Sequence, residues 1–255
     1  MYTEIEKYSG YLFSDEIKTG ENLPIGGSLL SRKHKLWMVV DGDSFDSLFE
    51  SIEKNQKDLK ENKTWKAWFN SLGTGIDYDL FCHMFIFNLV MNHRYPDATK
   101  NMGERVDFYR EGPKRLSDTL AENKFACAEY SVLAQLYFQR QGIPTRFVET
   151  ELGRGDPNDL DVEDHSFIVF QHNGKNFVYD PSNPLKTKAG DSLPRINEII
   201  GNNLRLKTKC LFNKTEWYYF GGENKEILQN LKPIKSNDKA PVAPTIASQL
   251  KNMQR

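Results

Sequence analysis

The fold of this chain is decided above all by residues 165–180, whose sequence is HSFIVFQHNGKNFVYD. Both halves are rich in β-branched and aromatic residues, and they flank Asn173-Gly174. This dipeptide strongly favours a two-residue type I′ hairpin turn, because both of its positions tolerate a positive φ. We therefore predict two antiparallel strands, residues 165–170 and 175–179. We also predict an earlier strand over residues 146–151, with a polar loop over residues 153–164 between it and the hairpin.

The register of this hairpin follows from its turn. Counting back from a two-residue loop puts Phe167 opposite Asp180 and His165 opposite Ser182. Opposite residues share a face, as do residues two apart, so His165 and Asp180 are predicted to be diagonal neighbours on one face. His172 falls on the other face beside the turn, where we expect it to be exposed. A slip of one residue would separate His165 from Asp180, and a surface pair on an exposed hairpin is the alternative interpretation.

Upstream of the hairpin, residues 126–141 have the pattern of a helix. The apolar positions recur at helical spacing: Val132, Leu133, Leu136 and Tyr137. Gly142-Ile143-Pro144 then ends the helix. Cys127 therefore falls in the first turn, where unpaired backbone amides and the helix dipole favour a thiolate. A buried cysteine packed at a helix end is the alternative.

Cys127, His165 and Asp180 occur in the order and setting that a cysteine acyl-transfer enzyme needs. A thiolate is the attacking group, an imidazole moves the proton, and a carboxylate holds the imidazole in the right tautomer. The other cysteines, Cys82 and Cys210, are predicted to be small buried hydrophobic residues. His83, in an apolar stretch, is predicted to be a core histidine with a satisfied hydrogen bond.

Four pieces of this region resemble the core of the transglutaminase-like (papain-like) superfamily. They are FACAEY at 125–130, QGIPTR at 141–146, DHS at 164–166 and VYDP at 178–181. The resemblance implies an α+β fold in which a helix bearing Cys127 packs on a small antiparallel β-sheet bearing His165 and Asp180. Additional N-terminal helices would form a lobe over the cleft. It also implies Cys127 as nucleophile, His165 as base and acid, and Asp180 as the residue that orients His165.

The chain departs from this family at the oxyanion site. Animal-type transglutaminases carry a tryptophan upstream of the cysteine, and here no tryptophan lies between Phe69 and Ala126. Trp68 and Asn123 are the side-chain candidates, and the backbone N–H of Cys127 is the safest donor.

We therefore expect acyl transfer through a thioester intermediate, with a protein-glutamine transglutaminase or deamidase as the leading interpretation. A cysteine protease of the same superfamily, a catalytically inactive binding module and an amine acyltransferase that uses a small thioester donor are the alternatives. The expected partners are a protein or peptide substrate, with a glutamine side chain favoured, and an amine acceptor. No cofactor and no metal are expected. Five acidic residues in the loop lack the spacing of an EF-hand and are interpreted as solvated: Asp156, Asp159, Asp161, Glu163 and Asp164.

Composition limits the remaining classes. The net charge of −1 gives no global attraction to nucleic acid or to an acidic membrane. The longest apolar run, around residues 84–91, is too short to span a bilayer, and no secretory signal peptide is visible at the start of the sequence. We expect a cytoplasmic protein, or one exported without a cleavable signal peptide.

Three regions are predicted along the chain. Residues 1–64 form an α/β extension that packs on the core, with a strand at 36–40 and a helix capped by Ser44. Residues 65–235 form the transglutaminase-like catalytic domain, which includes a buried helix at 77–92 and two strands within 204–220. Residues 236–255, with a proline-containing, weakly apolar composition, are predicted to be a disordered tail. Four apolar residues are expected to form the buried stripe of the first helix: Phe45, Leu48, Phe49 and Ile52. Trp65 and Trp68 are expected to be core anchors.

Overall fold

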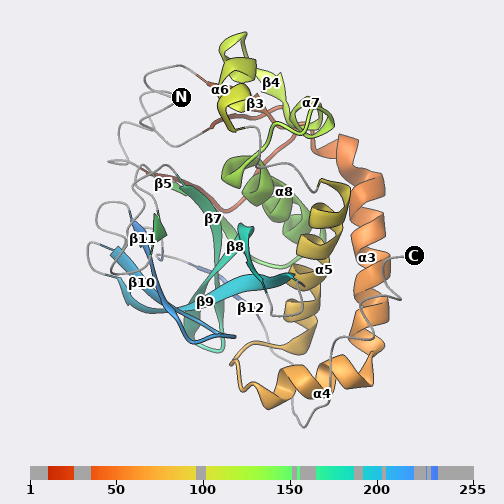
Figure 1. Ribbon diagram of the computed structural model, residues 1–255, viewed down its shortest axis with the longest axis vertical. Coiled ribbons are helices and arrows are strands. Elements are labelled where there is room, and N and C mark those ends of the chain that lie inside the picture. The colour runs from red at the N-terminus through yellow and green to blue at the C-terminus, as the bar shows by residue number, and fades with distance from the viewer. Residues whose placement is uncertain are drawn as a thin grey trace.

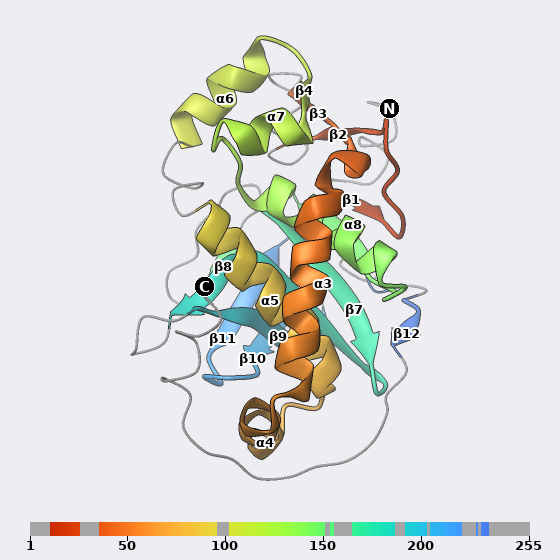
Figure 2. The same cartoon turned by 90° about the vertical axis from the view of Figure 1, so that its right-hand side faces the viewer.

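The computed structural model describes residues 11–25, 36–95, 102–150, 154–155, 165–186, 192–202, 205–220, 228 and 231–234. Within these residues the chain has an α+β fold, in which helices cover a curled, mainly antiparallel sheet (Figure 1, Figure 2). No described helix has both the length and the apolar content needed to cross a membrane. The expected tail at 236–255 lies outside the described residues, as does the loop at 153–164 except for Arg154–Gly155.

The helical elements alternate with strands in the first part of the chain. They are η1 (Gly42–Phe45), α3 (Asp46–Glu61), α4 (Lys63–Ser71), α5 (Tyr78–Arg94), α6 (Met102–Arg110), α7 (Leu116–Ala121) and α8 (Cys127–Arg140). A small sheet contains β2 (Asn22–Pro24), β3 (Trp37–Val39) and β4 (Lys114–Arg115). It lies beside α6 and α7, at the end of the molecule opposite α4 (Figure 1).

The large sheet contains β1 (Tyr11–Ser14), β5 (Arg146–Thr150), β6 (Arg154–Gly155), β7 (His165–His172), β8 (Lys175–Lys186), β9 (Ser192–Asn202), β10 (Arg205–Cys210), β11 (Glu216–Phe220) and β12 (Pro233–Ile234). Its order is β1-β5-β7-β8-β9-β10-β11-β6, and β12 pairs with β7 in parallel. The expected strands at 146–151 and within 204–220 are therefore present.

The hairpin at the centre of this sheet has the predicted turn and register. Asn173 and Gly174 both have positive φ, as a type I′ turn requires, and His172 pairs with Lys175. The β7–β8 pairs follow this register as far as Ile168 and Tyr179. Beyond them β8 continues past its predicted end, and its register with β9 shifts between Asp180 and Leu185. This shift in register falls in the polar segment of β8 that begins at Asp180.

The burial predicted for His172 is wrong. His172 is fully buried, and its Nε2 lies 3.4 Å from Asp77 Oδ1 at the start of α5. Ile234 of β12 pairs with His172 in the sheet. Strand alternation predicts only which face of the sheet a side chain takes. Both faces of this sheet are covered at His172, so the face away from His165 is not exposed to solvent.

The predicted buried stripe of the first helix agrees with the structure, but its predicted start does not. The four stripe residues of the first helix are all buried. Ser44 does not cap this helix, because α3 begins only at Asp46 and the Ser44 hydroxyl donates to Asp41 Oδ2 at 3.1 Å. At the far end of α3, Gln56 and Leu59 are also buried, against α5.

Aromatic side chains form the centre of the helical core. Phe81 stacks on Phe69 with ring centroids 4.5 Å apart, and Trp65 lies 5.0 Å from Phe85. Trp65 is almost fully buried and Trp68 is partly buried against this core. The core includes residues on both sides of the expected boundary at 64 and 65, which falls inside α4. A smaller cluster on the other face of the sheet contains Val148, Phe167, Val169, Val178, Leu206 and Tyr219.

Two expectations about polar or reactive core residues agree with the structure. Cys82 and Cys210 are both buried. His83 is largely buried, and its Nδ1 lies 2.7 Å from the Tyr137 hydroxyl. Burial lowers the pKa of His83 to about 4, so this histidine is neutral at physiological pH.

Candidate active site

Cys127 occupies the first position of α8, one residue from the predicted start of that helix. Ala126, the N-cap residue, has φ −140° and ψ −149°, and its N–H donates to Glu129 Oε2 at 2.9 Å. The preceding Phe125 is buried between Tyr95, 5.0 Å away by ring centroids, and Tyr130, 4.8 Å away. These contacts fix the entry to the helix and leave the Cys127 side chain only partly buried.

The structure brings the three predicted residues together. His165 Nε2 lies 2.9 Å from Asp180 Oδ2, and both side chains are fully buried. A side-chain hydrogen bond joins His165 to Cys127. Because Nε2 faces the carboxylate, Nδ1 is the ring nitrogen that remains for the thiol. Sulfur, imidazole and carboxylate therefore form one hydrogen-bonded chain that links α8, β7 and β8.

Electrostatics favour the charged form of both Cys127 and His165. Burial alone would raise the pKa of the thiol, but the hydrogen bond and charge of His165, with the charge of Arg105, hold the pKa of Cys127 below its usual value. Burial alone would lower the pKa of His165, yet Asp180 and Cys127 raise it to about 9. The arrangement supports a thiolate–imidazolium pair at neutral pH.

Asp180 is held by three further donors besides His165. The Ser182 hydroxyl donates to Oδ1 at 3.1 Å, and Asn183 Nδ2 donates to Oδ2 at 3.1 Å. The Tyr219 hydroxyl donates to Oδ2 at 3.1 Å, and its ring stacks on His165 with centroids 6.0 Å apart. These bonds fix the orientation of the carboxylate and keep it an acceptor for the imidazole. The sequence predicts none of the three donors as a partner of Asp180.

A buried ion pair lies under the first turn of α8. Arg105 of α6 donates from Nε to Glu129 Oε1 at 3.0 Å and from Nη2 to Oε2 at 2.9 Å. The Tyr109 hydroxyl donates to Glu129 Oε1 at 2.9 Å and lies 3.1 Å from the Thr119 hydroxyl. Arg105 is 3% exposed and Glu129 is fully buried. Glu129 lies three residues after the N-cap, and its bond to the Ala126 N–H could have been predicted from that spacing. No sequence pattern near Glu129 indicates its other partner, Arg105 of α6.

The structure argues against Trp68, one of the two side-chain candidates for the oxyanion site. Trp68 contacts Phe81 in the first turn of α5, whereas Tyr95, which packs on Phe125 two residues before Cys127, follows the last turn. At about 1.5 Å per residue these two positions are roughly 20 Å apart along α5. Asn123 is exposed with φ 53° and ends α7, where its N–H donates to the Leu120 carbonyl at 3.0 Å. The backbone N–H of Cys127, at the first position of α8, remains a candidate donor.

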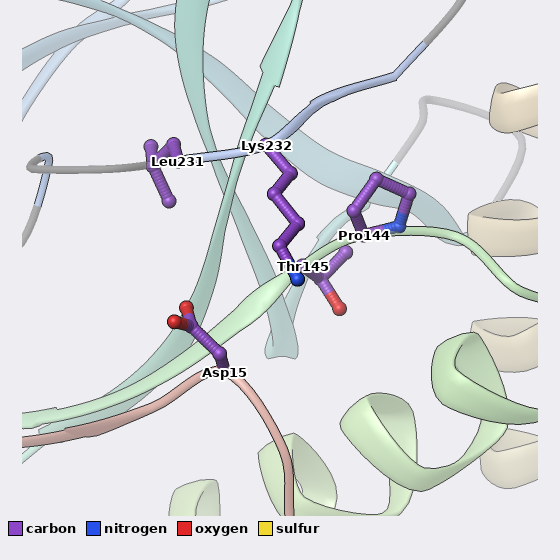
Figure 3. A pocket seen from close by; sticks show the side chains of 5 residues that line it. All are labelled: Asp15, Pro144, Thr145, Leu231 and Lys232. Atoms are coloured by element: carbon purple, nitrogen blue, oxygen red, sulfur yellow. The ribbon is translucent and has the colours of Figure 1, made fainter.

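A surface pocket lies at the other end of α8 (Figure 3). Its lining residues are Asp15, Pro144, Thr145, Leu231 and Lys232. Asp15 is already engaged by Arg146, whose Nε lies 2.7 Å from Oδ1. The 14 residues of α8 separate this pocket from Cys127, a length of about 21 Å at about 1.5 Å per residue. The pocket is therefore not part of the Cys127 site. Across the described ranges, no group of three or more His, Cys, Asp and Glu side chains is placed to hold a metal ion.

Comparison of the chain with protein-family models, curated proteins and solved structures finds no match.

Proposed function

We propose that the chain is a cysteine-dependent acyl-transfer enzyme with a transglutaminase-like, papain-like core. Cys127 is the nucleophile, His165 the general base and acid, and Asp180 the residue that orients His165. The observation that supports this most directly is the hydrogen-bonded chain of the three side chains, with the sulfur at a helix N-terminus. A buried structural cysteine has no need of an imidazole that is itself held by a carboxylate with three other donors.

The chemistry follows from these positions. The Cys127 thiolate attacks the carbonyl carbon of a carboxamide, and the backbone N–H of Cys127 stabilises the negative charge on oxygen. The C–N bond then breaks, and His165 gives its proton to the leaving ammonia or amine. A thioester remains on Cys127. An incoming amine or water attacks this thioester, His165 takes the proton of the attacking group, and the thiolate leaves.

The favoured acyl donor is the carboxamide of a protein glutamine, as the resemblance of the sequence to transglutaminases implies. With a lysine amine as second nucleophile the product is a crosslink, and with water it is a deamidated side chain. A peptide bond as acyl donor would make the same triad a protease. These outcomes share one mechanism and differ only in which carbonyl and which nucleophile the surroundings of Cys127 admit.

Intact-mass analysis of candidate proteins with a labelled primary amine tests this proposal. Incorporation of the amine that is lost in Cys127→Ala supports transglutamination, a gain of one mass unit per site supports deamidation, and new chain termini support proteolysis. The rate of Cys127 alkylation by iodoacetamide is measured in parallel. A wild-type rate no faster than that of a free thiol at neutral pH would contradict an activated nucleophile and favour an inactive binding module.

A further inference from the structure

Arg195 lies directly beside the proposed catalytic residues. It pairs with Asp180 across the β8–β9 ladder, and directly opposed residues share a face with Cβ atoms about 5 Å apart. Arg195 Nε donates to the Asn183 carbonyl at 2.9 Å, and Asn183 in turn donates from Nδ2 to Asp180. The guanidinium group is thus attached to the same irregular segment of β8 that holds the catalytic carboxylate.

Two contacts fix the plane of this guanidinium group. One is the bond from Nε, and the other is the ring of Trp217, whose centroid lies 4.3 Å from Arg195 Cζ. The side chain is half-buried. Within the described part of the chain, no carboxylate accepts a hydrogen bond from the terminal nitrogens of Arg195, and the buried indole N–H of Trp217 has no acceptor. A half-buried arginine normally has such a partner, so among the described residues this group of donors has unused capacity.

We propose that Arg195 is a specificity-determining residue that binds an anionic group, a carboxylate or a phosphate, on the acyl substrate. This inference rests on the proposed function. The terminal nitrogens of a guanidinium form a planar fork that matches the two oxygens of a carboxylate or phosphate, and an arginine that is already oriented loses little side-chain entropy on binding. One extended residue spans about 3.3–3.6 Å, so an acidic group a few residues from the reactive carboxamide would reach Arg195.

The test uses two alkylating probes of nearly equal size, iodoacetate and neutral iodoacetamide. Both consume the same Cys127 thiolate, so the ratio of their second-order rate constants is independent of the pKa of the thiol. Two unit charges about 10 Å apart at an effective dielectric constant of about 20 change a rate on the order of tenfold. We expect the iodoacetate-to-iodoacetamide ratio to fall by about tenfold in Arg195→Gln and by less in Arg195→Lys, which keeps the charge but not the fork.

Lys209→Gln is the matched control, because Lys209 is exposed on β10 and the substitution removes the same charge. Its ratio should equal the wild-type ratio. An unchanged ratio in Arg195→Gln, with wild-type circular dichroism and rapid alkylation by iodoacetamide, overturns the inference and leaves the proposed function standing. Slow wild-type alkylation by both probes would instead defeat the proposed function.

A competition experiment distinguishes the two sources of the anion. Glutarate and inorganic phosphate are each tested for protection of Cys127 against iodoacetate, in the wild type and in Arg195→Gln. Stronger protection by glutarate, lost in the variant, supports an acidic peptide substrate. Stronger protection by phosphate supports a phosphorylated acyl donor, and protection by either anion that persists in Arg195→Gln contradicts the role of Arg195.

Discussion

Replacing Arg105 by methionine would leave the buried Glu129 carboxylate without its cationic partner beneath the first turn of α8. In the native structure this carboxylate accepts three bonds from Arg105, one from Tyr109 and one from the N–H of Ala126. Arg105 and Glu129 are both almost completely removed from water. Burial would by itself lower the pKa of Arg105, but Glu129 outweighs it and raises that pKa, so the arginine stays charged.

The magnitude follows from this burial. Removing one partner of a buried ion pair costs about 3–5 kcal/mol, since the other charge is left without compensation. Arg105→Met and Glu129→Gln should each approach that loss. The double variant removes both charges and keeps an amide oxygen that can accept from Tyr109 or Ala126. It should lose only about 1–3 kcal/mol, the cost of the missing hydrogen bonds, and the two substitutions should therefore be strongly non-additive.

Urea unfolding at 25 °C, analysed as a double-mutant cycle, measures these free energies of unfolding. Arg110→Met is the matched control on the same helix, because Arg110 forms an exposed pair with Asp107. We expect it to change stability by no more than about 0.5 kcal/mol. The reasoning is refuted if Arg105→Met costs less than about 1 kcal/mol, or if the two single losses simply add.

Three other predictions concern the site and the core. His165→Gln removes the bond and the charge that lower the pKa of Cys127, so alkylation by iodoacetamide at pH 7 should slow by about tenfold or more; an equal rate in this variant would contradict the thiolate–imidazolium pair. The pKa of His165 is raised from 6.5 to about 9, so its contribution to stability is complete below about pH 6.5 and is lost as the pH rises through about 9. The difference in unfolding free energy between wild type and His165→Gln should therefore shrink from pH 6 to pH 10. A difference that stays constant over this range would contradict the raised pKa of His165. Phe81→Ala, which empties the centre of the aromatic core, should cost about 3–5 kcal/mol, whereas Ile200→Ala at an exposed position should cost less than about 0.5 kcal/mol by the same urea measurement.

Local physics accounts for what could be predicted from the sequence. The Asn173-Gly174 turn needs positive φ at two successive positions, and this requirement alone sets the β7–β8 register. The apolar spacing before Gly142 places Cys127 in the first turn of α8 in the same way. Two local rules, helix periodicity and strand alternation, therefore place Cys127 in the first turn of α8 and His165 and Asp180 on one face of the hairpin, whereas their roles are what the resemblance to transglutaminases implies.

Contacts between distant segments explain what was missed. Tyr219 contacts Asp180 only because the sheet curls through β9, β10 and β11. No sequence pattern near either residue predicts that the two side chains meet. The burial of His172 depends on β12 and α5, which cover a face that alternation by itself leaves open.

The sequence by itself determined the hairpin, the nucleophile's helix and the face shared by His165 and Asp180, because turn chemistry and side-chain periodicity act over a few neighbouring residues. Only the tertiary structure decided that Arg105 of α6 lies against Glu129 under Cys127 and that Arg195 lies on Trp217 beside Asp180. Those contacts depend on the packing of whole elements, whose free energy comes from surfaces that are not adjacent in the chain.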